Sequence, residues 1–373
     1  MSLCVAMLIA AEFMPVSLLT PIAQGLGASA GQTGQAIAIS GFFAVAASLV
    51  ITLGAGRLNR KWLLVAMTGL MLISLILVAM APSFAVLMLG RAVLGITIGG
   101  FWSMATAVLM RLVEPDRMPR ALTFMYAGQA SAAAFAAPIG SYLGAIVGWR
   151  GVFWLLVPIV AINLVWQIIA LPSLPVYKLQ NAGTLIGLLR RGYFVRGLVA
   201  ALFTFAGAYA MFTYLRPFLE TVTSLGVHGV TLMLLILGCA GFPGSWVGGR
   251  IASRHAIALV IAVPLMMLLA TIGLVLLGQL APLVGLFLAL WGMMNTALSI
   301  GWMAWIAQNV SDAPEAAGSL IVASIQATIL CGAALGGWLL DRFGIHATFI
   351  GSAAILVLAL LTIGSGRGLR RAG

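Results

Sequence analysis

The strongest constraint on the fold is a succession of long apolar segments, each close to the length that crosses a lipid bilayer. A helix needs about 20 predominantly apolar residues to span the hydrocarbon core. Only 7% of the residues are charged, whereas a soluble domain has roughly 25%. The sequence therefore predicts an all-α membrane protein with twelve transmembrane helices. The expected spans are about 3–24, 32–55, 62–81, 84–109, 120–146, 151–171, 194–215, 229–249, 256–278, 283–308, 316–340 and 345–364.

The basic residues predict the orientation of the chain. An even number of spans places both termini on one side, and 15 of the 19 lysines and arginines fall on that side. Cytoplasmic loops carry such an excess, so we expect both termini in the cytoplasm. The net charge of +12 is then a topology signal, and no nucleic-acid partner is expected.

The two halves of the chain resemble each other. A shift of 196 residues brings Pro21 onto Pro217, Gly140 onto Gly336, and Phe153 onto Phe349. A repeat of six spans keeps its orientation, and transporters built from parallel repeats hold their substrate near midplane between the halves. The predicted domains are an N-terminal six-helix half (1–171), a cytoplasmic linker (172–193) and a C-terminal six-helix half with a short basic tail (194–373).

Two formal charges lie well inside predicted spans, Glu12 in the first and Arg91 in the fourth. Charged groups at this depth are costly and are usually functional. Arginine stays protonated in proteins, so Arg91 needs an anion or a dipole, and Glu12 is the one acid within the spans. We predict that Glu12 and Arg91 form a proton-coupling site. Two alternatives remain: Glu12 faces a wet vestibule and aids folding, or Arg91 only caps carbonyl groups.

Polar and aromatic side chains recur in the spans expected to face a central cavity. Aromatic rings stack on planar groups, and carboxamides pair with hydroxyl or base edges, so a sugar or a planar heterocycle would suit this lining. The alternative is an interfacial aromatic belt or lipid-facing filler, above all for Tyr214, Trp291 and Trp305. The candidate substrate-binding residues are Phe13, Trp102, Tyr126, Gln129, Tyr209, Phe212, Asn295, Trp302 and Gln326.

The sequence contains no recognisable catalytic set, phosphate-binding loop or metal-ligand spacing. We therefore expect no enzyme activity, no cofactor and no metal. Because the chain also has no ATPase domain, transport would depend on an ion gradient.

Several segments carry a resemblance to a known family. AEFMPVSLLTPIAQGLG, GRAVLGITIGGFWSMATAVLMRLVEP, GWRGVF, LPSLP, FTYLRP and GWMAWIAQ look like the drug–proton antiporter branch of the major facilitator superfamily. Within that branch they are most similar to the bacterial purine ribonucleoside efflux pumps. The resemblance implies the major facilitator fold in the bacterial inner membrane. It also implies a monomer that exports inosine, guanosine or 6-mercaptopurine-type analogues in exchange for protons.

The resemblance extends to three conformational motifs. They are the basic loop between spans two and three, the arginine–glycine motif of span four, and the Gly-Pro motif of span five. Gly56 replaces the acid of the loop between spans two and three, and Ala137 and Ser141 depart from the Gly-Pro motif of span five. The alternative for the basic loop is that its charges only set the topology. The alternative for the motif in span five is ordinary helix packing. A broader exporter of drugs, sugars or chloramphenicol stays open, as do a facilitator without proton coupling and a non-transporting membrane sensor or membrane-embedded enzyme. The candidate motif residues are Arg57, Arg60, Lys61, Gly95, Gly99, Pro138 and Gly140.

Overall fold

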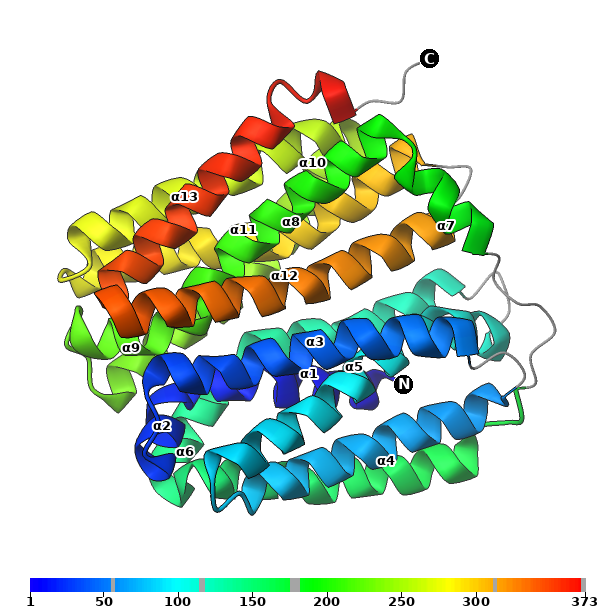
Figure 1. The fold of residues 1–373 in the computed structure, drawn as a ribbon, viewed down its shortest axis with the longest axis horizontal. Coiled ribbons are helices and arrows are strands. Elements are labelled where there is room, and N and C mark those ends of the chain that lie inside the picture. The colour runs from blue at the N-terminus through cyan, green and yellow to red at the C-terminus, as the bar shows by residue number, and fades with distance from the viewer. Residues whose placement is uncertain (55–57, 114–117, 175–181, 311–313, 370–373) are drawn as a thin grey trace. The chain divides into compact units, whose positions relative to one another are not determined.

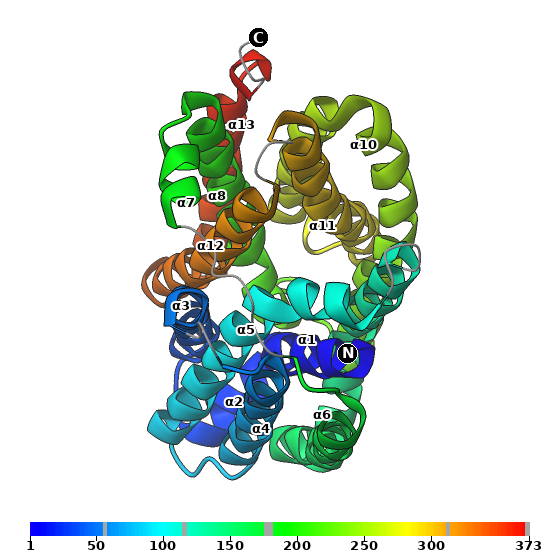
Figure 2. The same ribbon diagram turned by 90° about the vertical axis from the view of Figure 1, so that its right-hand side faces the viewer.

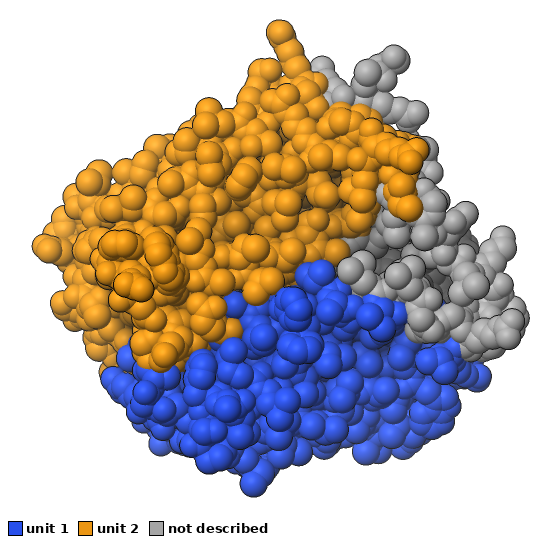
Figure 3. Space-filling view, in the orientation of Figure 1, with its two compact units in different colours: residues 1–28, 36–180 blue, residues 29–35, 181–373 orange. Residues whose placement is uncertain are grey.

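The described chain is helical throughout. The computed structural model describes residues 1–54, 58–113, 118–174, 182–310 and 314–369, and this part contains no β-strand (Figure 1). The chain divides into two compact units, coloured separately in Figure 3. Residues 1–28 and 36–180 form the first unit, and residues 29–35 and 181–373 form the second.

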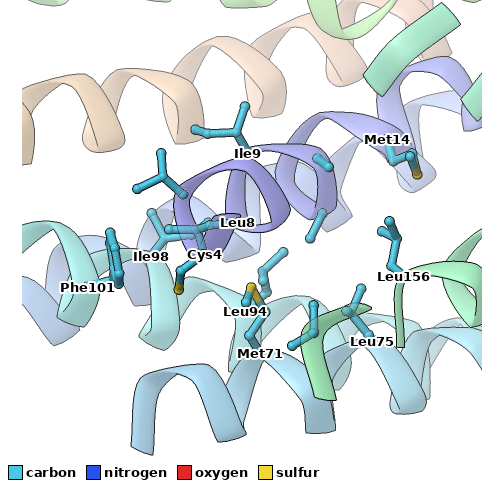
Figure 4. Packing of buried hydrophobic residues seen from close by; sticks show 14 of the residues in the cluster. Cys4, Leu8, Ile9, Met14, Met71, Leu75, Leu94, Ile98, Phe101 and Leu156 are labelled. Atoms are coloured by element: carbon cyan, nitrogen blue, oxygen red, sulfur yellow. The ribbon is translucent and has the colours of Figure 1, made fainter. Parts of the chain in front are cut away.

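The first unit is built around its N-terminal helix. Cys4, Leu8, Ile9 and Met14 of this helix are buried in a cluster that includes side chains from the other helices of the unit, as Figure 4 shows. Most of α1 is buried, as expected for a segment that is hydrophobic on all sides, and its most extensive contact is with α6. The helices are α1 (Ser2–Ser17), α2 (Leu19–Leu26), α3 (Ala30–Gly54), α4 (Arg60–Ala79), α5 (Phe84–Leu112) and α6 (Met118–Ala170).

In the second unit, α10 and α11 form the most extensive helix–helix contact, and α8 packs against both α12 and α13 (Figure 2). A short 3-10 helix, η2 (Arg367–Leu369), contacts α8. The helices are α7 (Ala182–Leu189), α8 (Gly192–Thr213), α9 (Leu215–Thr221), α10 (Val227–Leu277), α11 (Ala281–Asn309), α12 (Pro314–Phe343) and α13 (Ile345–Ile363).

Two of these helices are interrupted and do not run straight through. The 53-residue α6 breaks at Gly148 (φ 74°), and the 51-residue α10 breaks at His255 (φ −139°). An unbroken helix of that size would be about 80 Å long at 1.5 Å per residue, far more than a bilayer core of about 30 Å. With these breaks, helix occupies every one of the expected spans. The expected spans 229–249 and 256–278 both lie in α10, and helix continues past 249 up to Arg254.

The all-α membrane fold is confirmed. In the described part of the chain, eight helices are long and apolar enough to cross a membrane, or nine if the bent pair α1–α2 counts as one span. The figure of twelve crossings and the domain limits 1–171, 172–193 and 194–373 remain predictions; the expected linker includes α7.

The internal repeat is visible in the backbone of the two units. Span one breaks at Leu18 (φ −110°, ψ 9°), and the residue 196 positions later, Tyr214, breaks span seven with φ −107° and ψ 17°. Gly148 (φ 74°, ψ 161°) likewise corresponds to Gly344 (φ 83°, ψ 176°). Positive φ favours glycine because it lacks a Cβ, so the same residue type makes the same one-residue turn in both units.

Candidate transport site

The site in the first unit begins with a proline. Pro15 lies inside α1 and carries no N–H group. In an α-helix the carbonyl of residue i accepts from the N–H of residue i+4, so Pro15 leaves the carbonyl of Ala11 without its helical donor. Two residues beyond Ser17, α2 begins at an angle of 68° to α1. The sequence thus creates a free acceptor beside Glu12, deep in the first span.

Arg91 of α5 donates a hydrogen bond to that acceptor. Its side chain is only 1% exposed, and its Nη1 donates to the carbonyl oxygen of Ala11 at 2.8 Å. Nη2 donates to the carbonyl oxygen of Glu12 at 3.4 Å. The guanidinium group therefore joins α5 to α1 through the main chain of the segment that contains the buried acid.

The same guanidinium group also binds α3. Nε donates to the carbonyl oxygen of Ala36 at 3.0 Å, and Nη2 donates to Oγ of Ser40 at 3.1 Å. The hydroxyl group of Ser40 in turn donates to the carbonyl oxygen of Ile37. Arg91 thus makes four hydrogen bonds to neutral oxygens on two helices, which is how a permanent charge can be held away from water.

Glu12 is buried close to Arg91, with 6% of its surface exposed. The two side chains interact electrostatically, yet among the described residues they form no ion pair within 4.0 Å. The carboxylate is therefore near a fixed positive charge without being locked to it. Such an acid can change its protonation state while Arg91 keeps its own hydrogen bonds.

Two members of this arrangement were missed in the sequence analysis. The free carbonyl of Ala11 could have been predicted from the sequence, since Pro15, which has no N–H group, stands four residues after it. Ser40 could not have been, because one serine in an apolar span is unremarkable until its helix is placed beside Arg91.

The motif glycines lie where helices approach closely. A Cβ atom on Gly95 would collide with the carbonyl of Ser40, and one on Gly99 would collide with the carbonyl of Ala44. A Cβ on Gly140 of α6, two residues after the buried Pro138, would instead collide with the side chains of Ser17 and Met14 of α1. Gly95 and Gly99 allow main chains to touch, which is a usual reason for small residues between membrane helices.

The basic motif is only partly described, because Arg57 lies outside the described residues. Arg60 begins α4, and the ammonium group of Lys61 lies 5.5 Å from the ring centre of Trp62. Asn59, next to Arg60, caps α4 and accepts a hydrogen bond from the N–H of Leu174 at 2.9 Å. Its own amide group donates to Ser173 at 2.7 Å, so Asn59 fastens the start of the linker to α4.

The candidate substrate residues of the first unit differ in how they are held. Phe13 and Trp102 are half-buried against the core cluster, and Trp102 meets Phe101 edge to face at 5.9 Å. Gln129 of α6 has a buried Oε1 atom for which the described part of the chain offers no hydrogen-bond partner. Tyr126 lies in the helical backbone of α6, but its side chain is outside the described part of the structure.

In the second unit the aromatic candidates form stacked groups. The Tyr209 and Phe212 rings meet edge to face at 6.2 Å, and Phe212 stacks on Trp291 at 5.7 Å. Asn295 is half-buried, and Gln326 is 8% exposed. Trp302 is 1% exposed and packs against Trp305.

The belt alternative is wrong for the three aromatic residues to which it applied most. Tyr214, Trp291 and Trp305 are each at most 1% exposed, so they are interior side chains of the second unit. Tyr214 donates to the carbonyl oxygen of Ala333, and Trp305 donates to that of Leu369.

Long apolar helices in two repeated units, with a charged group buried inside one of them, define a multi-pass membrane transporter. A sequence model described as the Major Facilitator Superfamily matches residues 1–324. The chain belongs to this superfamily. Its members are transporters and not enzymes, so the prediction that the chain is not an enzyme is confirmed.

Three similarities refine this assignment. The chain is 47% identical to "Transcription regulatory protein OpdE" of Pseudomonas aeruginosa over 379 residues, covering 100% of this chain and 94% of that protein. It is 38% identical to "Purine ribonucleoside efflux pump NepI" of Escherichia coli O6:H1 over 360 residues, covering 96% and 91%. The Salmonella typhimurium protein of the same name is 37% identical over 360 residues, with the same coverage.

The fold matches a solved transporter. A bacterial homologue of the human lysosomal transporter Spinster, in an inward-facing and occupied conformation, gives a TM-score of 0.75. The match covers 97% of this chain and 94% of that one at 14% identity, so it supports the fold alone.

Proposed function

We propose that this protein exports purine ribonucleosides and their analogues in exchange for protons. The similarity to purine ribonucleoside efflux pumps, which extends over 96% of the chain, carries the substrate class. Inosine, guanosine and 6-mercaptopurine-type compounds are the proposed cargo. Their flat bases and sugar hydroxyl groups suit the aromatic and carboxamide side chains named as candidates.

The proposed coupling residues are Glu12 and Arg91. A buried carboxyl group that is near a guanidinium group, but not ion-paired with it, can take up and release a proton. Arg91 maintains the shape of the site throughout, because its hydrogen bonds go to oxygens other than the Glu12 carboxylate. In this proposal the loading of a proton and the loading of a nucleoside alternate.

The proposed setting is the bacterial inner membrane, with both termini in the cytoplasm and the protein acting as a monomer. The basic residues at the α10 break and at the C-terminal end support that orientation through the positive-inside rule. Neither a cofactor nor a metal takes part in the proposed cycle.

The test is transport of labelled inosine into or out of proteoliposomes with an imposed proton gradient. Movement of inosine opposite to the proton gradient, abolished when a protonophore collapses it, supports the proposal. A folded protein that leaves inosine unmoved would contradict the nucleoside assignment. A panel of chloramphenicol, sugars and lipophilic cations would then identify the broader exporter, which is the alternative within the same superfamily.

A second candidate function comes from the 47% identity to a protein named as a transcription regulator. On that account the chain affects gene expression, either as a membrane sensor or by altering the concentration of an effector that it transports. Transcript profiles of a gene deletion, complemented with wild type or with a transport-dead variant, separate these cases. A regulatory effect restored by the transport-dead variant would favour the sensor.

A further inference from the structure

We propose that a pocket at the break in α10 binds the phosphate headgroup of an anionic phospholipid. The pocket has a volume of about 470 Å³ and is lined by side chains between Trp246 and His255. None of the candidate substrate residues lines it, so the proposal concerns a separate ligand. It rests on the proposed orientation, in which this end of α10 is cytoplasmic, and not on the proposed cargo.

Three side chains of the pocket lie on one face of the helix. Trp246, Arg250 and Arg254 are spaced four residues apart, and α10 is helical as far as Arg254. Residues four apart are neighbours on a helix surface, so Arg250 and Arg254 project from adjacent positions, and both line the pocket. The guanidinium group of Arg250 also lies over the Trp246 ring, 5.3 Å from its centre. This arrangement presents two planar donors toward one space, which suits a phosphate group.

The two guanidinium groups have no acidic partner nearby in sequence. Between Glu220 and Asp312 the chain has no aspartate or glutamate, so α10 and α11 supply no carboxylate. Within the described residues neither Arg250 nor Arg254 forms an ion pair. Among the described residues no carboxylate offsets the repulsion between these two like charges, and a bound anion would relieve it.

The main chain of the pocket is fixed in place. Ala252 is buried, and its carbonyl oxygen accepts a 3.0 Å hydrogen bond from Nε2 of Gln308 on α11. The break in the helix follows directly at His255, which also lines the pocket. The hydrogen bond from Gln308 thus ties the main chain of the pocket to α11.

The neighbouring apolar surface favours a lipid over a soluble phosphate. Trp246 is 66% exposed and Ile251 is 38% exposed, both at the end of a long apolar helix. Tryptophan at such positions sits at the level of the headgroups, and basic clusters on the cytoplasmic side attract anionic lipids. An acyl chain could lie along this surface while its phosphate occupies the pocket.

Native mass spectrometry of the full-length protein tests the proposal with defined lipids. The protein is titrated with phosphatidylglycerol, with phosphatidylethanolamine, and with inorganic phosphate as a soluble competitor. We expect phosphatidylglycerol to bind more tightly than phosphatidylethanolamine, and inorganic phosphate to leave it bound. Equal binding of the two lipids, or displacement by inorganic phosphate, would overturn the lipid assignment.

A matched pair of variants locates the site. Arg250→Gln with Arg254→Gln should weaken phosphatidylglycerol binding roughly thirtyfold, since each basic residue near the surface contributes about fivefold. Arg190→Gln with Arg367→Gln removes the same charge from exposed positions outside the pocket and should change binding little. Equal losses in both double variants would show an unspecific charge effect and overturn the site.

Quenching of Trp246 provides a second readout that needs no arginine variant. Phosphatidylglycerol with brominated acyl chains should quench the tryptophan fluorescence of the wild type more strongly than that of Trp246→Phe. With brominated phosphatidylethanolamine, the difference in quenching between the two proteins should be smaller. The same difference with both lipids would contradict a selective site.

Discussion

Arg91 donates a 2.8 Å hydrogen bond to the main-chain carbonyl of Ala11, the carbonyl that Pro15 deprives of its own helical donor. The buried arginine thereby replaces the hydrogen bond that α1 lacks at Pro15, and the free carbonyl gives the arginine an acceptor. The relationship explains how a permanent charge is tolerated inside an apolar unit and why it lies beside Glu12.

Arg91→Lys should destabilise the protein by about 1–3 kcal/mol, although it keeps the positive charge. A single ammonium group cannot reach the four oxygens on α1 and α3 that the planar guanidinium group binds, and unsatisfied buried acceptors are costly. Thermal unfolding in detergent measures the loss. Arg367→Lys, at an exposed position, is the control and should unfold like wild type. Equal stability of Arg91→Lys and wild type would show that these hydrogen bonds contribute little.

Gly99→Ala should destabilise the contact between α5 and α3, because its new Cβ would collide with the carbonyl of Ala44. The matched control is Gly69→Ala in α4, where no atom lies within 4 Å of the added carbon. At that open helical position alanine should stabilise by about 0.5–1 kcal/mol. Opposite shifts in the unfolding temperature are the expected result, and two shifts of the same sign would contradict the close approach.

Gly148→Ala and Gly344→Ala should each cost about 1–2 kcal/mol. Both residues have positive φ, a conformation that is strained for a residue with a Cβ. Because the two glycines occupy equivalent places in the repeat, their effects should be similar in size and additive. A neutral result at either position would argue against equivalent turns.

Trp305→Phe should loosen the C-terminal end of the chain. The indole Nε1 donates to the carbonyl of Leu369 at 2.9 Å, and both residues are fully buried. Losing a neutral hydrogen bond of this kind costs about 1 kcal/mol, and proteolysis of the tail should become faster. Trp166→Phe, whose indole is 61% exposed, is the control. An unchanged cleavage rate in Trp305→Phe would show that the tail is held by other contacts.

The sequence predicted the helices well because membrane thickness sets their length. The observed bounds differ from the expected ones by only a few residues for helices such as α4 and α13. The expected span ended at 249, yet α10 continues to Arg254, because arginines on a helix surface can extend into the headgroup region. A short basic tail was expected, but its hydrogen bond with Trp305 was not, since nothing near Trp305 in sequence points to Leu369 as its partner.

The buried charges were also found from sequence, since Glu12 and Arg91 stand out in an apolar background. Their geometry was not, because it depends on how three helices meet. The prediction emphasised an attraction between the two side chains. The structure instead gives Arg91 main-chain and hydroxyl acceptors, and the Glu12 carboxyl group is left outside that network.

In the proposed transport cycle Glu12 is the proton-carrying group, and one paired assay tests this role directly. Glu12→Gln is compared with Glu220→Gln, which removes the carboxylate of the Arg216 ion pair on α9 instead. Both are reconstituted for labelled inosine transport. We predict that Glu12→Gln still exchanges inosine across the membrane at equal concentrations but no longer accumulates it under a proton gradient, whereas Glu220→Gln accumulates it normally. Gradient-driven accumulation by Glu12→Gln would contradict the coupling role of this residue.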